Sequence, residues 1–353
     1  MPSHIAVVGS GIAGVTFAEE IRKLDQDAYV TLLTRETGGY YSRPLLSHGF
    51  TRGDIETKIV LKSFPALVNT GIAVESGAEV LSLDRGAKTL HFRKNGEDKR
   101  LSYDKLVLAT GSSALIPPPF RGQENLFQTL NSLDDLVGLR RLRAEIQRRD
   151  PRPRWAVVGG GLIGCEVSAD LAKAGDRVVL FHALPRLMER QLAEEDSDTL
   201  LHVMRDALGV EVLLDQNVQG FEHLLKIAEA APYRADGDLT VKLADGSVAG
   251  FHAIIVACGF KPRIELAQHS GLETRRGIVV DRFLTTSDTD AYAIGDCAEL
   301  PDGKLYAYVT PIRNQGLWLA KYLTGHTQEP WQVPTFKPKA KVPGFEAARP
   351  YLF

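Results

Sequence analysis

One glycine-rich segment near the N-terminus restricts the possible folds of this chain more than any other feature. It follows a short, β-rich apolar run, Ile5–Val8, and precedes a helical pattern of apolar residues. Its glycines are Gly9, Gly11 and Gly14. In such a unit the first glycine permits a tight turn, the second lets a pyrophosphate approach the backbone, and the third lets the helix pack close to the strand. The segment therefore predicts a strand, a turn and a helix whose N-terminus faces a dinucleotide phosphate.

The same pattern returns later in the chain, in RWAVVGGGLIGCEVSADLAKAG. There Gly159, Gly161 and Gly164 follow the apolar run Trp155–Val158, at an offset of 159 − 9 = 150 from Gly9. The strand before the glycines and the helical pattern after them are both present again. This second copy predicts a second dinucleotide site of the same design.

A second pair of segments repeats in the same order. KLVLATGSS and AIIVACGFK are apolar strand patterns that end at Gly111 and Gly259, an offset of 259 − 111 = 148. Two repeated pairs at nearly equal offsets predict an α/β fold with two Rossmann-like dinucleotide-binding domains. Transfer of a hydride from a nicotinamide to a flavin is the chemistry that needs two such sites.

The residues that would bind each adenosine ribose differ between the copies. An acidic residue is expected about 20 residues after the glycines, and Glu36 lies 36 − 14 = 22 positions after Gly14. We expect Glu36 to bind a ribose, although a solvated loop charge gives the same pattern. The corresponding strand of the second copy ends at His182, and Arg186 is either a 2′-phosphate ligand or a loop charge. The residues thus leave NADH and NADPH open.

A third motif, TSDTDAYAIGDCAEL, ends a strand at Gly295–Asp296. Together with the ATG sequence at Ala109–Gly111 and the first glycine segment, it resembles the signature set of the FAD-dependent pyridine nucleotide-disulphide oxidoreductases. The resemblance implies that Asp296 hydrogen-bonds FAD. It also implies that the helix beginning near Thr310 and Pro311 points its N-terminus at the flavin, and Thr310 is the expected N-cap.

This resemblance also implies a domain order. The FAD-binding domain is expected at residues 1–112 and 263–328, with an NAD(P)H-binding domain, 113–262, inserted in it. Relatives continue into a C-terminal interface domain, whereas residues 329–353 carry five prolines and a basic run. We expect those residues to be a tail, or the start of an interface domain that is missing or truncated. The basic run is either a solvated linker or a region that attracts an acidic carrier.

The segment YSRPLLSHGF, residues 41–50, resembles the RPxLS motif of the rubredoxin and flavorubredoxin reductases. In a related branch a redox-active cysteine follows the leucine and serine, and His48 holds that position here. The resemblance implies that Arg43 and Pro44 flank the flavin. It places Glu166, in the expected first turn of the second glycine-segment helix, beside the nicotinamide, where a contact with His48 is possible.

The implied reaction is hydride transfer from NAD(P)H to FAD, followed by single electrons to a small iron carrier such as rubredoxin, flavorubredoxin or ferredoxin. The resemblance favours NADH as the coenzyme, with NADPH not excluded. Cys165, Cys258 and Cys297 form no CxxC or CxxxxC pair, so we expect them to be structural. The alternatives are an NADH oxidase and a non-catalytic flavin-binding NADH sensor.

The candidate residues form two groups. Those expected to contribute to catalysis are Glu166, Arg43 and His48. Those expected to bind FAD or the coenzyme are Gly9, Gly11, Gly14, Glu36, Arg43, Pro44, Val80, Thr110, Gly111, Asp296, Thr310, Gly159, Gly161, Gly164 and Gly259.

Composition limits the remaining classes. The formal net charge is −2, so no basic field points to nucleic acid. The N-terminal segment lacks a signal-peptide pattern, and no apolar run reaches the roughly 18–20 residues of a membrane span. No metal-ligand motif is present. We expect a cytoplasmic protein that binds neither nucleic acid, membrane nor metal.

Overall fold

The computed structural model describes residues 3–223, 237–246 and 248–352. Residues 224–236 and 247, within the expected NAD(P)H-binding domain, lie outside the described part. The chain forms two compact units. Unit 1 contains Met1–Ser42, Val60–Ser113 and Lys261–Phe336, and unit 2 contains Arg43–Ile59, Ala114–Phe260 and Lys337–Phe353.

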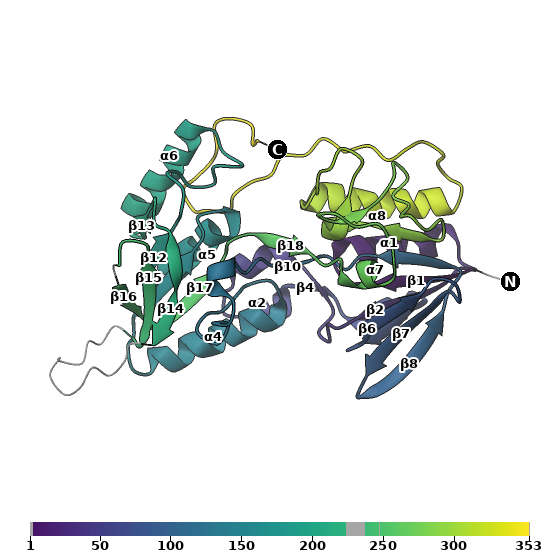
Figure 1. Cartoon of the computed structure of the whole chain (residues 1–353), viewed down its shortest axis with the longest axis horizontal. Helices are drawn as coiled ribbons and strands as arrows, with labels where there is room; N and C mark the ends of the chain where they lie inside the picture. Colours follow the sequence, from purple (N-terminus) through teal and green to yellow (C-terminus); the bar gives the residue numbers. More distant parts are fainter. Residues whose placement is uncertain (1–2, 224–236, 247, 353) are drawn as a thin grey trace. The chain divides into compact units, whose positions relative to one another are not determined.

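Unit 1 is built on a five-stranded parallel sheet of order β20-β9-β1-β2-β5, with an antiparallel sheet β6-β7-β8 (Figure 1). Its strands are β1 (His4–Val8), β2 (Tyr29–Thr34), β3 (Tyr40–Tyr41), β4 (Val60–Lys62), β5 (Ile72–Ser76), β6 (Glu79–Asp84), β7 (Thr89–Lys94), β8 (Glu97–Ser102), β9 (Lys105–Leu108), β19 (Ile278–Val279), β20 (Ala291–Ala293) and β21 (Ala298–Glu299). Its helices are α1 (Ile12–Leu24), α3 (Phe64–Val68), α7 (Glu265–His269) and α8 (Val309–Leu323), with the 3-10 turn η4 (Gly295–Cys297).

Helix α1 carries its apolar side chains on one face, and that face is buried in the core of unit 1. Val15, Phe17, Ala18 and Ile21 are each at most 1% exposed. Helix α8 packs against α1. The two helices approach closely at Gly316, because a Cβ at that position would lie 2.8 Å from a backbone oxygen of α1.

Unit 2 is built on a four-stranded parallel sheet of order β13-β12-β11-β17, again with an antiparallel sheet, β14-β15-β16. Its strands are β11 (Arg154–Val158), β12 (Arg177–Phe181), β13 (Glu211–Leu213), β14 (Val218–His223), β15 (Leu239–Leu243), β16 (Val248–Phe251) and β17 (Ala253–Val256). Its helices are α2 (Ile55–Lys58), α4 (Leu133–Gln147), α5 (Leu162–Lys173) and α6 (Glu194–His202), with the short turns η1 (Arg43–His48), η2 (Pro118–Phe120) and η3 (Val203–Ala207). The chain crosses between the units at β10 (Ser112–Ala114) and β18 (Phe260–Pro262), which pair with each other.

The two parallel sheets share one topology. The strands β9-β1-β2-β5 of unit 1 correspond one by one to β17-β11-β12-β13 of unit 2. In both sets the fourth strand along the chain lies beside the first, and the second and third follow. A glycine loop and a helix follow the first strand of each sheet. The prediction of an α/β fold with two Rossmann-like domains is therefore confirmed.

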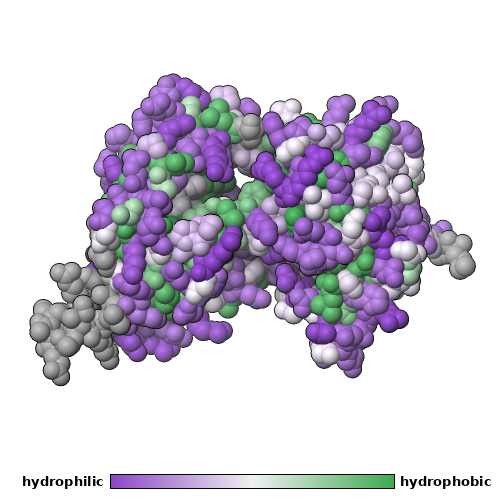
Figure 2. Space-filling view, in the orientation of Figure 1, coloured by the Kyte–Doolittle hydropathy of each residue, from purple (hydrophilic) through white to green (hydrophobic). Residues whose placement is uncertain are grey.

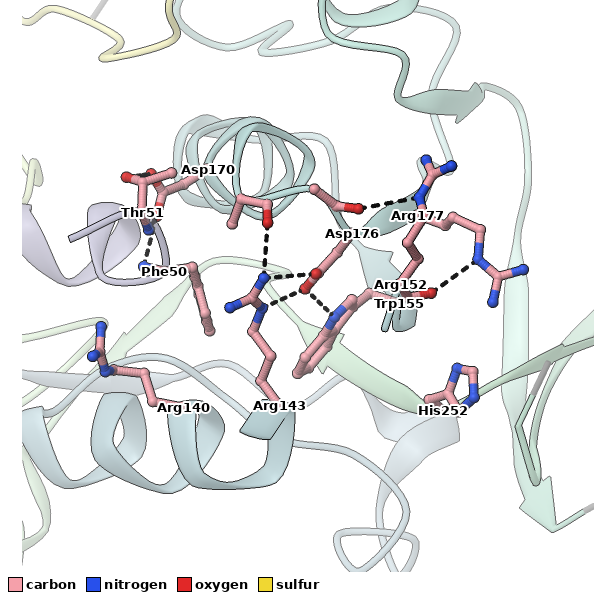
Figure 3. A network of polar contacts seen from close by, with 12 residues as sticks. Phe50, Thr51, Arg140, Arg143, Arg152, Trp155, Asp170, Asp176, Arg177 and His252 are labelled. Atoms are coloured by element: carbon pink, nitrogen blue, oxygen red, sulfur yellow. Dashed lines mark hydrogen bonds and ion pairs between the residues drawn. The ribbon is translucent and has the colours of Figure 1, made fainter. Parts of the chain in front are cut away.

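The segment 43–59 belongs to unit 2 by its contacts, although the sequence placed it with the FAD-binding residues. The Asp170 carboxylate, on α5, accepts hydrogen bonds from the backbone N–H groups of Phe50 and Thr51 at 2.7 and 3.2 Å (Figure 3). The Thr51 hydroxyl donates to it at 2.6 Å. Arg140, on α4, donates to backbone oxygens of residues 49, 52 and 53. Two helices of unit 2 thus hold this segment.

A buried ion pair ties α4 to the sheet of unit 2. Asp176 has a fully buried side chain, and its carboxylate accepts two hydrogen bonds from Arg143, at 2.7 and 2.8 Å (Figure 3). The Trp155 indole donates a third, at 2.9 Å. A buried carboxylate needs such partners, because removal from water is otherwise costly.

Polar and charged side chains cover most of the face shown in Figure 2, with apolar side chains scattered among them. Among the described residues, no helix combines the length and the apolar character that a bilayer crossing requires.

Candidate functional site

The first glycine segment forms the predicted strand–turn–helix in unit 1. Gly9 has φ +118°, and a Cβ there would lie 2.1 Å from the Ala109 carbonyl oxygen. A Cβ on Gly14 would lie 2.0 Å from the Gly9 carbonyl oxygen. Side chains at either position would collide with backbone, so both glycines are required by the fold itself.

Gly11 differs from the other two glycines. A Cβ built there meets no described atom within 4 Å. Gly11 is also the N-cap of α1, and no side chain caps that helix in the described chain. The start of α1 therefore combines open space beside Gly11 with the lack of a side-chain cap, which is the arrangement that binds a phosphate.

Unit 2 repeats this geometry. Gly159 has φ +113°, and a Cβ there would lie 2.4 Å from the Ala257 carbonyl oxygen. A Cβ on Gly164 would lie 1.8 Å from the Gly159 carbonyl oxygen, whereas one on Gly161 meets no described atom within 4 Å. Gly161 is the N-cap of α5, which likewise has no side-chain cap in the described residues.

Glu36 lies just beyond the end of β2 and close to the first glycine loop. Its carboxylate accepts a hydrogen bond from the Tyr41 hydroxyl at 2.9 Å. Its backbone N–H donates to the Thr34 hydroxyl, which is 2.7 Å from the Ser10 hydroxyl in the glycine loop. A chain of hydroxyl groups thus positions the backbone of Glu36 next to the loop.

Asp296 lies at the carboxyl end of β20, in η4. Its carboxylate accepts a hydrogen bond from the Ser112 hydroxyl at 2.7 Å. Gly295 has φ +84°, and its N–H donates to the Gln315 side chain on α8 at 2.7 Å. The turn that presents Asp296 is therefore fixed to α8.

The remaining candidates are Thr110, Gly111 and Val80 in unit 1 and Gly259 in unit 2. The Thr110 hydroxyl donates to the Arg263 carbonyl at 2.7 Å, and Gly111 has φ +68°. Val80, on β6, is half-buried and packs against the core of unit 1. In unit 2, Gly259 has φ +109° and accepts a hydrogen bond from the Leu115 N–H.

The expected N-cap of α8 is wrong. The helix begins at Val309, so Tyr308 is its N-cap and Thr310 its second residue. Pro311 is then the third helical residue. It is tolerated there because an N–H in the first turn has no partner within the helix.

Glu166 lies deeper in its helix than the sequence suggested. Helix α5 begins at Leu162, so Glu166 is its fifth residue and no acidic residue lies in the first turn. The side chain is 2% exposed. The Ser47 hydroxyl donates to one carboxylate oxygen at 2.6 Å, and the Lys341 backbone N–H donates to the other at 2.8 Å. The Glu166 carboxylate is therefore buried, and each of its oxygens accepts a hydrogen bond.

His48 lies beside this carboxylate. Its Nε2 is 4.0 Å from Glu166 Oε2 and is buried without a hydrogen-bond partner among the described residues. Burial lowers the pKa of His48, and the carboxylates of Glu166 and Asp170 oppose that shift. The possible contact between His48 and Glu166 is therefore present in the structure, although it is longer than a hydrogen bond.

Arg43 and Pro44, which precede His48 in the chain, each take part in a hydrogen bond to a backbone carbonyl. The Arg43 guanidinium donates to the Asn131 carbonyl at 2.5 Å. The Pro44 carbonyl accepts a hydrogen bond from the Lys341 ammonium at 2.8 Å. Sequence reasoning missed Ser47, Asp170 and the Lys341 backbone as partners of this cluster. The serine of the RPLLS motif was the one available signal.

The three cysteines are unpaired. Cys165 and Cys297 are fully buried, and burial raises the pKa of both thiols. Burial raises the pKa of Cys258 to about 11. A thiol with a raised pKa is a poor nucleophile at neutral pH, because the thiolate is the reactive form.

Comparison with known proteins agrees with this geometry. The sequence pattern of the pyridine nucleotide-disulphide oxidoreductases matches residues 3–316. The chain is 33% identical over 326 residues to the rubredoxin-NAD(+) reductase of Alcanivorax borkumensis, covering 92% of this chain and 80% of the relative. It is 34% identical over 346 residues to the nitric oxide reductase FlRd-NAD(+) reductase of Escherichia coli O9:H4, covering 97% of this chain and 84% of the relative.

Solved structures show the same fold. The reductase in a covalent putidaredoxin reductase–putidaredoxin complex superposes with a TM-score of 0.79 at 28% identity, covering 92% of this chain and 75% of that one. The ferredoxin reductase for the CYP199A2 system of Rhodopseudomonas palustris gives a TM-score of 0.79 at 27% identity, covering 94% and 78%. The chain belongs to the pyridine nucleotide-disulphide oxidoreductase family.

Proposed function

We propose that this chain is an NAD(P)H-dependent flavoprotein reductase that passes electrons to a small iron carrier. The proposal is supported mainly by a geometry that occurs in both units. In each, a glycine loop with an open face lies beside a helix N-terminus that no described side chain caps, and we call this arrangement the cradle. Members of the family bind FAD and NAD(H). Relatives are named for reactions with rubredoxin and FlRd, and a solved neighbour is bound to putidaredoxin.

Unit 1 is proposed as the FAD-binding domain. The open space beside Gly11 and the start of α1, which no described side chain caps, fit a pyrophosphate, whose negative charge the helix dipole stabilises. Glu36 offers a carboxylate beyond the strand end for a ribose. Asp296 would hold the polar chain between the ribose and the flavin ring. The first helical turn of α8, at Thr310, would supply a positive dipole to the ring.

Unit 2 is proposed as the NAD(P)H-binding domain. Its cradle beside Gly161 has the same open face as that of Gly11, so it fits the pyrophosphate of a second dinucleotide in the same way. Glu166, His48 and Arg43, which all belong to unit 2, are proposed to contribute to hydride transfer. The Ser47 hydroxyl and the Lys341 N–H fix both carboxylate oxygens of Glu166, so this side chain is suited to positioning rather than to proton transfer.

The proposed electron acceptor follows from the absence of a reactive thiol. The three cysteines are unpaired, and burial raises the pKa of each thiol. FAD, when bound, accepts two electrons as a hydride and releases them one at a time, which suits an iron carrier. The unpaired cysteines also support a reducing compartment, and we propose the cytoplasm.

Anaerobic mixing tests the proposal. The purified protein is expected to be yellow, and NADH should bleach its flavin absorbance. Oxidised rubredoxin, or a [2Fe–2S] ferredoxin tested in parallel, should then restore the absorbance in two one-electron steps. Failure to bleach would favour a sensor, and rapid turnover with oxygen but with neither iron protein would favour an NADH oxidase.

A further inference from the structure

His182, the residue directly after β12, bridges the second glycine loop and the Glu189 carboxylate. The His182 ring is buried directly after β12, with Nδ1 3.0 Å from the Gly160 nitrogen. Its Nε2 lies 3.1 Å from both the Arg186 carbonyl oxygen and Glu189 Oε2. Carbonyl and carboxylate oxygens only accept hydrogen bonds, so Nε2 carries the proton. Nδ1 then accepts the hydrogen bond from the Gly160 N–H.

The loop that carries Glu189 is fixed against the glycine loop. The Met188 N–H donates to the Gly160 carbonyl at 2.9 Å. A Cβ on Gly160 would lie 2.7 Å from His182 Cγ and 2.6 Å from Leu187 Cδ2, so the ring and the loop both pack on this glycine. Glu189 follows Met188 directly, and its side chain is 21% exposed. Its carboxylate is therefore anchored on one side and open to solvent on the other.

The same arrangement occurs in unit 1. Strand registers make Thr34 equivalent to His182, because Val8 pairs with Leu33 and Val158 pairs with Phe181. Thr34 also bonds the middle of its glycine loop, and the acid again follows the strand end. In each unit the residue at the strand end contacts the loop, and a later carboxylate lies beyond it.

Of the two arginines near Glu189, Arg186 is held by its own loop and Arg190 extends into solvent. Arg186 donates to the carbonyls of Leu192 and Glu189, at 2.9 and 3.2 Å, so it stabilises its own loop. Arg190 is 84% exposed and 3.6 Å from Glu189 Oε1. Such an exposed pair contributes little. The anchored charge at this strand end is the carboxylate.

We propose that Glu189, presented by His182, selects NADH over NADPH. Rossmann domains bind the adenosine ribose at the end of this strand, and an acid there accepts a hydrogen bond from the 2′-hydroxyl. The 2′-phosphate of NADPH would instead meet a like charge, which disfavours binding. This inference rests on the proposed function and deepens it by naming the coenzyme and the residue that selects it.

Binding of unreactive coenzyme analogues to the FAD-loaded protein tests the inference without turnover. The probes are 1,4,5,6-tetrahydro-NADH and its 2′-phosphorylated form, with Kd measured by calorimetry. We expect the wild type to prefer the first by about tenfold or more. Glu189→Gln should remove most of that preference and Glu189→Arg should reverse it. Glu194→Gln, at an exposed acid at the start of α6, should leave it unchanged.

The outcomes separate this inference from the proposed function. A wild type that favours the phosphorylated analogue, or a Glu189→Gln variant with undiminished preference, overturns the role of Glu189 and leaves the reductase intact. Binding of neither analogue to the wild type overturns both. Retained flavin absorbance, together with a thermal unfolding midpoint close to that of the wild type, shows that each variant has folded in both units.

Discussion

Replacing Gly161 by alanine separates a requirement of the fold from a requirement of binding. Gly161 has φ −79° and ψ −174°, a conformation that alanine adopts without strain. A Cβ there meets no described atom within 4 Å. Alanine also restricts the unfolded chain more than glycine does. The variant is therefore expected to fold with a free energy of unfolding within about 1 kcal/mol of the wild type's, because the restricted unfolded chain opposes the weaker N-cap preference of alanine.

Coenzyme binding should be affected more strongly than stability. The new methyl group would occupy the space in which the pyrophosphate approaches the backbone. Overpacking of this kind costs about 1–3 kcal/mol. That penalty raises the Kd of the tetrahydro-NADH analogue about 5- to 150-fold. Thermal unfolding of the protein without coenzyme measures the first effect, and calorimetric titration of the FAD-loaded protein measures the second.

Gly11→Ala is the matched variant in unit 1, because the φ of Gly11, −71°, is close to that of Gly161 and a Cβ there also meets no described atom within 4 Å. It should lower FAD retention and leave coenzyme affinity of the loaded fraction unchanged. If Gly161→Ala binds the analogue as the wild type does, the space beside Gly161 is not the pyrophosphate site. If Gly161→Ala loses FAD instead, the two dinucleotides are assigned to the wrong units.

Three further variants probe the buried polar groups of unit 2. Arg143→Met leaves the buried Asp176 carboxylate without its cation, and denaturant titration should show a loss of about 3–5 kcal/mol in the free energy of unfolding; a loss below about 1 kcal/mol would show that water reaches the carboxylate. Ser47→Ala removes one donor to Glu166 and should cost about 1–3 kcal/mol in the same assay, with Ser47→Thr as the conservative control. Because burial lowers the pKa of His48, the unfolded chain binds the proton first as pH falls. The contribution of His48 to the free energy of unfolding is therefore complete above the ordinary histidine pKa of 6.5 and declines below it. His48→Asn should flatten the dependence of the free energy of unfolding on pH between about pH 7.5 and 5. An unchanged slope would show that protonation of His48 does not cause this dependence.

The glycine loops were predictable from sequence because their constraints are local. Gly14 must lack a side chain because its Cβ would meet the carbonyl of Gly9, five residues earlier. Gly164 meets Gly159 in the same way. A spacing of a few residues therefore encodes both the turn and the close packing of the helix. The repeat of that spacing then implied the repeated topology of the two sheets.

The start of α8 was less predictable, although the residues that could determine it are also close together in sequence. Thr310 and Pro311 suit an N-cap and a first helical position. The helix nevertheless begins at Val309, after an extended Tyr308 with φ −128° and ψ 148°. Proline fits anywhere in a first turn, so its presence locates the turn and not the residue at which the helix begins.

The surroundings of Glu166 could not be predicted because its partners are distant in sequence. Ser47 and Lys341 are 119 and 175 residues away, and neither carries a pattern that specifies Glu166 as its partner. The sequence placed Glu166 in the first turn of its helix and gave no sign that its carboxylate is buried. A carboxylate that is 2% exposed persists only with donors on its oxygens. The two donors come from the segments 43–59 and 337–353, so the geometry of Glu166 depends on both segments remaining in place on unit 2.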